Sequence, residues 1–427
     1  MIFASIGSLL GLLFLGIPVA ATLAIVGLIL SALFSPLPLH FAIAEITWTV
    51  SNNFLLIAIP LFVMLGELLL RSGLASRMYS ALVLWMPWLP GGLMHSNIAA
   101  CAMFAATSGS SVATAATIGT VALEEVQKNS YNERIFLGTI AAGGTLGILI
   151  PPSINLILYG VLTETSIPQL YLAGIIPGFV LAALFSLCVI LFCLWRPHWG
   201  GVRTSASWKS RLHALPDLLP PLIIFLSVIG SIYMGWATAT EAAALGVVAT
   251  IIIAATYRCL SVQVMLQAFE GTMRTSAMIM AVMFGAYFLN LVFGAIGLPT
   301  QVSTWIANMD LSPFQLFLLI VIFYFILGMF METLSMMVAT VPIVAPILAA
   351  AGFDPIWSGI IIVLLMEIAL ITPPIGLNLF VVQSIRTRGK IMDVIVGTLP
   401  FVLVMISFVF LLYAFPGIAL SLPQGMR

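Results

Sequence analysis

Apolar stretches of about 20 residues recur from one end of this chain to the other, each long enough to cross a lipid bilayer as a helix. Hydrophobic residues make up 62% of the chain and charged residues only 7%, whereas soluble domains carry about a quarter charged residues. So few charges cannot solvate the surface of a water-soluble fold of this size, but lipid requires none. The pattern therefore predicts an all-α polytopic membrane protein.

The distribution of basic residues predicts a topology. Because Lys and Arg gather in cytoplasmic loops, their grouping predicts about ten spans and two re-entrant hairpins, with both termini on the periplasmic side. Residues 73–89 are expected to lie as a helix on the cytoplasmic surface. The hairpins are predicted at 91–127 and 312–350. The spans are predicted at 2–16, 18–34, 53–71, 133–162, 168–195, 216–235, 238–258, 274–298, 355–385 and 391–415.

The two halves of the chain resemble each other weakly. LGILIPPSINLIL (146–158) is similar to EIALITPPIGLNLF (367–380), and each Pro-Pro pair follows a predicted hairpin with a polar centre, TSGSS or METLS. The spacing from Ser110 to Pro151 is 41 residues, and so is the spacing from Glu332 to Pro373. In the predicted topology the halves run in opposite directions. Inverted repeats with broken helices are a transporter architecture with its site near the midplane.

The Pro-Pro pairs predict where the backbone opens. Proline has no N–H and clashes with the carbonyl one turn earlier, so each pair should free carbonyls at about residues 147–150 and 369–372. Carbonyl and hydroxyl oxygens suit sodium, and the half-helices after Pro152 and Pro374 direct positive dipole ends at an anion. A lone proline in a membrane helix is usually only a kink. Two pairs in matching register favour a binding site.

Four acidic side chains lie within or beside the predicted spans. Glu332 is predicted to serve ion binding, tip packing or substrate orientation, and Glu367 either a hydrogen-bond network or transport. Glu67 and Arg71 are four residues apart and should pair on a helix. Glu241 is expected to cap a helix start.

Five motifs resemble those of one transporter family. They are IPLFVMLGELLLRSGLA (59–75), SGSS (108–111), GGTLGILIPPSI (143–154), ATATEAAA (237–244) and ITPPIGLN (371–378). The sequence resembles the large, DctM-type permease subunit of tripartite ATP-independent periplasmic (TRAP) transporters. The resemblance implies an elevator-type sodium symporter that imports carboxylates without ATP. It also implies two partners: a separate small four-helix membrane subunit and a periplasmic substrate-binding protein.

The resemblance also implies site residues. A first sodium site falls on Ser108, Gly109, Ser110, Ser111, Gly147, Ile150 and Pro152. A second falls on Gly328, Glu332, Thr333, Ala369, Thr372 and Ile375. The expected substrate-lining residues are Ser110, Ser153, Asn155, Glu332 and Asn378. Relatives often carry Asp where this chain has Glu332.

The resemblance also divides the chain. The predicted moving block comprises 91–163 and 299–386, and the predicted scaffold comprises 1–90, 164–298 and 387–427. A stand-alone sodium–dicarboxylate symporter is the alternative function, whereas an intramembrane enzyme would need a nucleophile–base pair or metal ligands that the sequence does not offer. Sialic acids, C4-dicarboxylates, keto acids and compatible solutes all remain possible substrates.

Overall fold

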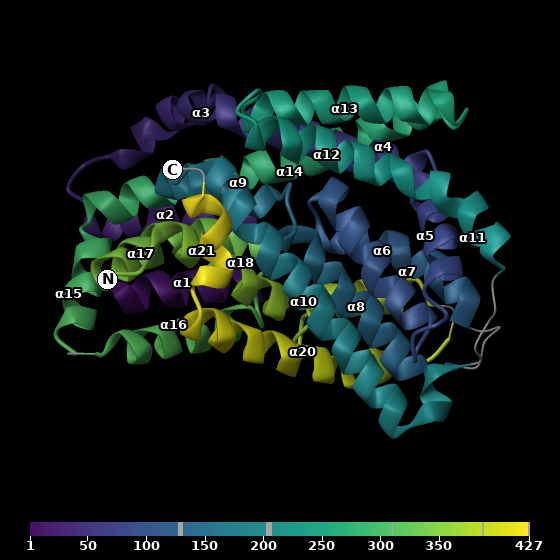
Figure 1. The fold of residues 1–427 in the computed structure, drawn as a ribbon. Helices are drawn as coiled ribbons and strands as arrows, with labels where there is room; N and C mark the ends of the chain where they lie inside the picture. The colour runs from purple at the N-terminus through teal and green to yellow at the C-terminus, as the bar shows by residue number, and fades with distance from the viewer. Residues whose placement is uncertain (127–130, 202–206, 310, 387, 426–427) are drawn as a thin grey trace.

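The computed structural model describes residues 1–126, 131–201, 207–309, 311–386 and 388–425, and all the regular structure in these ranges is helical (Figure 1). Seven described helices are long and apolar enough to cross a membrane, or eight if the bent pair at the first Pro-Pro break counts as one span. The first two predicted spans are helices of 13 and 16 residues. They are therefore shorter than a full crossing requires, and the predicted span 355–385 is broken into two shorter helices, so three of the ten predicted spans are missing from the count. Thr333–Ala350, which was predicted as an arm of the second hairpin, is long enough to be counted.

A hairpin followed by a broken helix occurs once in each half. The first half contains α1 (Ile2–Phe14), α2 (Val19–Phe34), α3 (Ile43–Ser51), α4 (Ala58–Arg71), α5 (Leu74–Trp85), hairpin arms α6 (Leu93–Ser108) and α7 (Ser111–Val126), broken helix α8 (Glu133–Leu149) with α9 (Ile154–Thr163), and α10 (Ile167–Trp195). The second contains α11 (Trp208–Ala214), α12 (Leu219–Tyr233), α13 (Ala239–Thr256), α14 (Val262–Ala295), α15 (Leu298–Ala307), hairpin arms α16 (Pro313–Leu327) and α17 (Thr333–Ala350), broken helix α18 (Pro355–Leu370) with α19 (Leu377–Ser384), α20 (Ile391–Ala414) and α21 (Gly417–Gln424). The matching order supports a repeat, and its inversion in the membrane stays a prediction.

Two local features that the sequence predicts are present in the helices. Thr238 and Glu241 form a capping box at the start of α13, in which each side chain accepts the other residue's backbone N–H. The expected capping role of Glu241 is therefore confirmed. The Glu67–Arg71 pair is also present, with 3.1 Å between Oε2 and Nε.

The helices pack into two groups. Helices α2, α4, α12, α13 and α14 contact one another, and α12 and α13 run along one edge of the molecule in Figure 1. The other group contains the hairpins and broken helices, joined by α10 and α20. Within it, α7 packs on α19, α17 on α9, α20 on α8 and α10 on α18. Each of these pairs joins one half of the chain to the other, so neither repeat packs alone.

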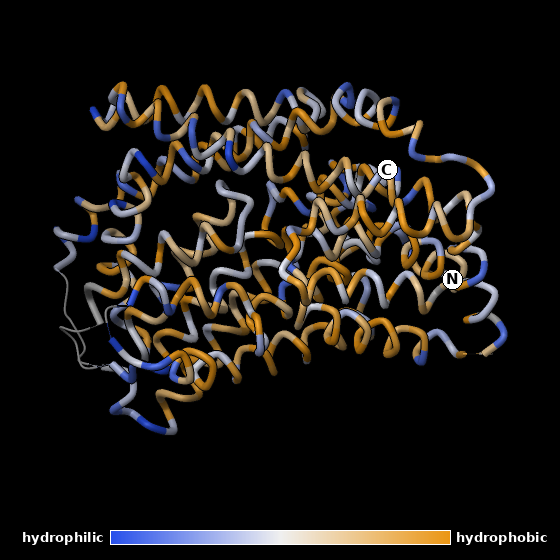
Figure 2. Tube along the Cα trace, turned by 180° about the vertical axis from the view of Figure 1, so that it is seen from behind, coloured by the Kyte–Doolittle hydropathy of each residue, from blue (hydrophilic) through white to orange (hydrophobic). Residues whose placement is uncertain are grey.

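The outer surface is apolar. Large hydrophobic side chains are exposed on the outward faces of long helices, as at Leu226, Ile252 and Leu403. Figure 2 shows hydrophobic residues along the body of the molecule and hydrophilic ones mainly at the turns. An apolar belt of this extent would aggregate in water, and it matches a surface that faces lipid. Helix α5 is found where the surface helix was predicted, with Leu74, Met78 and Leu82 on its buried face.

Candidate functional site

The first hairpin tip lies directly against the first helix break. Gly109 has a left-handed backbone (φ 61°), and a Cβ built on it would come 2.9 Å from the carbonyl oxygen of Pro152. A Cβ on Gly147 would come 2.7 Å from the carbonyl oxygen of Ser110. Both glycines therefore allow a close backbone approach that a side chain would prevent. The structure thus brings together these four members of the predicted first sodium site.

Hydrogen bonds order this tip. The hydroxyls of Ser108 and Thr114 are 2.9 Å apart, and Thr114 donates to the carbonyl of Ser110 over 2.7 Å. Ser111 donates to Oε2 of Glu367, also over 2.7 Å. Thr114 was not predicted from the sequence, although it follows Ser110 by one helical turn and so points back at the tip.

The breaks free fewer carbonyls than predicted. In an unbroken helix, the carbonyls of Gly147 and Ile148 would accept hydrogen bonds from the N–H groups of residues 151 and 152. Both residues are prolines without an N–H, so these two carbonyls lose their helical donors. At the second break, however, the Ala369 carbonyl accepts from Thr372 N at 3.3 Å, and the Thr372 carbonyl accepts from Gly376 N at 3.2 Å. A carbonyl oxygen has two lone pairs, so each keeps one for a ligand. The Pro151–Pro152 and Pro373–Pro374 peptide bonds are both cis.

The second tip mirrors the first in its glycine contact. A Cβ on Gly328 would overlap the side chain of Ala369, so this tip also meets its break closely. Glu332 caps α17 by accepting hydrogen bonds from Ser335 N and Oγ, at 3.3 and 3.0 Å. The Thr372 hydroxyl donates to the Ile368 carbonyl over 2.6 Å. Glu332 thus caps α17 at the tip, and its predicted roles in ion binding, tip packing or substrate orientation stay predictions.

The remaining members of the predicted sodium sites are Ile150, Ile375 and Thr333. Ile150 is fully buried, and a Cβ on Gly178 of α10 would come 2.5 Å from its side chain. Ile375 is 40% exposed, and Thr333 is the first residue of α17. Neither isoleucine side chain can bind a cation, so only its backbone carbonyl is available as a ligand.

A cavity of about 380 Å³ lies between the two tips and the helices α4 and α14. Among the predicted substrate residues, Ser110, Asn155 and Glu332 line it. The other two do not line the cavity, and each has a hydrogen-bond partner elsewhere. Ser153 accepts from Leu156 N at 3.3 Å, and Asn378 donates to the Ala141 carbonyl at 3.2 Å. The volume suits a small organic molecule.

The opposite wall of the cavity comes from helices that sequence reasoning did not assign to the site. Glu67 of α4 lines it, together with Thr275, Met278 and Ile279 of α14. Glu67 was predicted only as the partner of Arg71. The sequence does place Thr275 and Met278 one helical turn apart, but it does not say which face of α14 meets the tips.

The charged side chains that line the cavity in the described part of the chain are all acidic. Its described lining residues include the carboxylates of Glu67 and Glu332 but no Lys, Arg or His. Arg71 offsets the first carboxylate, whereas Glu332 has only hydrogen bonds. The Asn155 side chain lines the same cavity, is 1% exposed, and its Nδ2 has no hydrogen-bond partner among the described residues. The cavity therefore offers an unused donor but no positive side chain.

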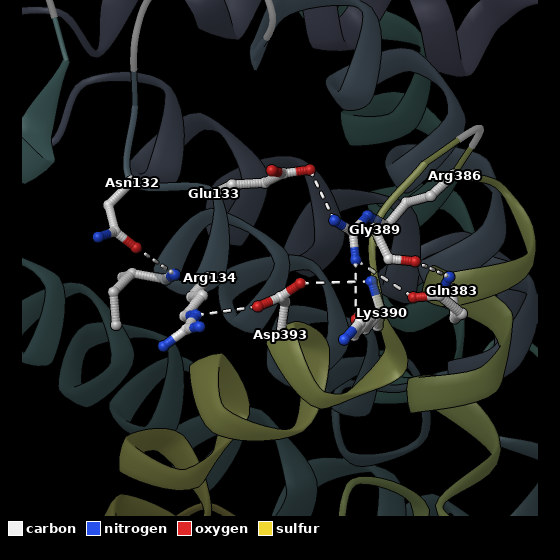
Figure 3. A network of polar contacts seen from close by, with 9 residues as sticks. Asn132, Glu133, Arg134, Gln383, Arg386, Gly389, Lys390 and Asp393 are labelled. Atoms are coloured by element: carbon white, nitrogen blue, oxygen red, sulfur yellow. Dashed lines mark hydrogen bonds and ion pairs between the residues drawn. The ribbon is translucent and has the colours of Figure 1, made fainter.

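A polar network ties the two broken helices together at one end (Figure 3). Arg386, whose side chain is 2% exposed, donates from Nη2 to Glu133 of α8 over 2.7 Å. Arg386 also donates to the carbonyl of Lys390, and Arg134 binds Asp393 of α20 at 3.0 Å. The start of α8 is thereby joined to the end of α19 and the start of α20.

Replacing Arg386 with alanine is expected to lower the free energy of unfolding by about 2–3 kcal/mol, because the variant loses a buried charged hydrogen bond to a half-exposed carboxylate. Thermal unfolding in detergent or nanodiscs measures this change. The matched control is Arg274→Ala, whose partner Glu270 is 3.5 Å away in a mostly exposed pair and should contribute little. Equal unfolding temperatures for both variants would contradict the prediction.

The helix order and the apolar surface define a polytopic membrane protein. The fold is similar to the YdaH transporter of Alcanivorax borkumensis, with a TM-score of 0.67 and 17% identity over 95% of this chain and 98% of that chain. Residues 6–418 match the family described as the tripartite ATP-independent periplasmic transporter, DctM component, and the chain belongs to this family. The resemblance noted in the motifs is thus confirmed.

Two of the curated relatives match over nearly their whole length. The C4-dicarboxylate TRAP transporter large permease protein DctM of Pseudomonas aeruginosa is 33% identical over 95% of this chain and 94% of its own. The sialic acid TRAP transporter large permease protein SiaM of Vibrio cholerae is 31% identical over 98% of both chains. These relatives are transporter permeases, so the protein is a transporter subunit rather than an enzyme.

Proposed function

We propose that this chain imports an organic acid by sodium symport, as the large permease subunit of a tripartite transporter in the bacterial inner membrane. The charge of the cavity carries the proposal. A carboxylate substrate that enters beside Glu332 meets a negative side chain and no positive one. Cations bound at the tips would offset this repulsion, so substrate binding would require them.

Sodium is the cation that the available ligands fit. Hydroxyl and carbonyl oxygens lie at both tips, in the Ser108–Ser111 turn and around Thr333 and Thr372. These are hard, neutral oxygen donors, which suit a hard monovalent cation better than a soft metal. The Asn155 amide and the start of α9 would then hold the substrate carboxylate. Membrane potential would assist import by about 2.3 kcal/mol per charge per 100 mV.

The proposed movement is an elevator step in which one group of helices slides against the other. The moving block comprises the hairpins and the broken helices. We add α10 and α20 to it, because α10 packs on α18 and α20 packs on α8. The sequence-based division assigned both helices to the scaffold. In the redrawn division, α2, α4, α12, α13 and α14 remain as the scaffold.

The proposed partners are a small four-helix membrane subunit and a periplasmic substrate-binding protein. The proposed orientation places both termini in the periplasm. The named relatives carry C4-dicarboxylates and sialic acid, both of which are carboxylates. We propose a carboxylate for this chain too, selected chiefly by the binding protein.

The test is uptake into proteoliposomes that contain this chain, its small subunit and the cognate binding protein, with and without a sodium gradient. Wild-type uptake should require sodium, and Ser110→Ala combined with Thr372→Ala should reduce it at least about tenfold, the effect of losing roughly 1.4 kcal/mol of binding. Unchanged uptake in the double variant would overturn the site assignment. Full uptake without the binding protein would instead favour a stand-alone symporter.

A further inference from the structure

One buried hydrogen bond connects the first hairpin tip to the second broken helix. Ser111 begins α7 and donates to Oε2 of Glu367 in α18 over 2.7 Å, although the two residues are 256 positions apart in sequence. The side chains are almost completely enclosed, with Ser111 1% exposed and Glu367 0% exposed. Because α7 and α18 belong to different repeats, this hydrogen bond passes between the repeats at their centre.

Glu367 is poorly provided with other partners. Its second oxygen, Oε1, has no hydrogen-bond partner among the described residues, and no described basic side chain lies within ion-pair distance of it. A buried carboxyl group that loses its only hydrogen bond is left unsatisfied at considerable cost. The Ser111 contact therefore holds the start of α7 and the last turn of α18 in one relative position.

One end of this hydrogen bond belongs to the first predicted sodium site, and the other lies two residues before a member of the second. Ser111 is part of the first tip, beside Ser110 and Gly147. Glu367 precedes Ala369 by two residues on the same helix, and Ala369 touches Gly328 of the second tip. A shift of Ser111 would thus be transmitted along α18 to the carbonyls of the second break. Glu367 does not line the cavity between the tips, so direct contact with substrate is not its role.

We propose that Glu367 is a positioning residue that couples the two sodium sites through Ser111. Sodium at the first tip fixes Ser111, the hydrogen bond fixes α18, and the carbonyls of Ala369 and Thr372 are then placed for the second ion. Binding of one sodium ion thereby favours binding of the other. The inference rests on the proposed sodium symport and adds the route by which the two ions cooperate.

The experiment measures uptake against sodium concentration in proteoliposomes with the cognate binding protein. Wild type should show a Hill coefficient above 1. Glu367→Met keeps a similar length but removes the acceptor, so the Hill coefficient should fall towards 1 and half-saturation should rise about tenfold, within the usual range of coupling between sites. Glu367→Gln keeps an oxygen that accepts from Ser111 and should restore cooperative sodium dependence to near wild type.

Controls separate coupling from folding. Ser358→Ala removes a different buried polar group of α18, a hydroxyl that has no described hydrogen-bond partner, and it should leave the sodium curve unchanged. A merely structural role for Glu367 would lower the maximal rate or the unfolding temperature of the methionine variant but leave its Hill coefficient intact, and this result would overturn the inference. If Glu367→Met does not fold, Ser111→Ala tests the same bond from the donor side, with loss of cooperativity expected.

The outcomes also distinguish the coupling from the proposed sodium symport on which it rests. If wild-type uptake does not depend on sodium, the proposed symport and the coupling both fall. If wild-type uptake depends on sodium cooperatively and Glu367→Met retains that cooperativity, only the coupling falls. Equal defects in the glutamine and methionine variants would also overturn it, because glutamine preserves the acceptor.

Discussion

Gly147→Val is expected to reduce sodium-dependent uptake by about tenfold to a hundredfold while the chain still reaches the membrane. The first Cβ atom alone would come 2.7 Å from the Ser110 carbonyl oxygen and 2.9 Å from the Thr114 hydroxyl. Overfilling a packed site of this kind typically costs about 1–3 kcal/mol. The first tip can relieve the overlap only by moving away from its break, which displaces the predicted ligands of the first sodium ion.

Two measurements check this prediction: uptake in proteoliposomes and sodium-dependent thermal stabilisation of the purified protein. Gly147→Ala should give a smaller defect in the same direction. Gly230→Val in α12 is the matched control, because nothing lies within 4 Å of a Cβ at that position. A valine variant with wild-type half-saturation for sodium would show that the tip does not need its close approach to α8.

Gly397→Val is expected to destabilise the fold by more than about 3 kcal/mol, above the usual cost of overfilling a core. Gly397 lies on α20, where its backbone meets α8 directly. A Cβ on Gly397 would overlap the Arg134 carbonyl, and a Cβ on Gly138 would overlap the Gly397 carbonyl. Neither helix backbone can rotate out of the way as a side chain can, so the two helices must separate. Separation would also stretch the contact between Arg134 and Asp393.

The unfolding temperature in detergent or nanodiscs is the readout for this variant. Gly294→Val in α14 is the control, since nothing lies within 4 Å of a Cβ there. Close contact of glycine-bearing helices is a common basis of packing in membranes, where lipid supplies no hydrophobic drive between helices. An unfolding temperature equal to that of the control would show that the α8–α20 contact tolerates a valine side chain, contrary to the backbone geometry.

The fold and site were predictable where the cause is local. The helix breaks follow from the missing N–H groups of two proline pairs, and the Glu67–Arg71 pair follows from four-residue spacing. The number of spans was less predictable. Apolar composition identifies α1 and α2 as membrane helices, but their lengths depend on the turn at Gly16 and on neighbouring helices.

What the sequence by itself determined is the pair of polar hairpin tips and helix breaks, because glycine, serine and proline impose those turns through their own covalent structure. Only the tertiary structure decided which surfaces meet. It placed Glu67 and Thr275 opposite the tips, joined Ser111 to Glu367, and set α20 against α8. Such contacts depend on the relative rotation of helices far apart in the chain, and in a helix that is apolar all round no periodic pattern marks the face that packs.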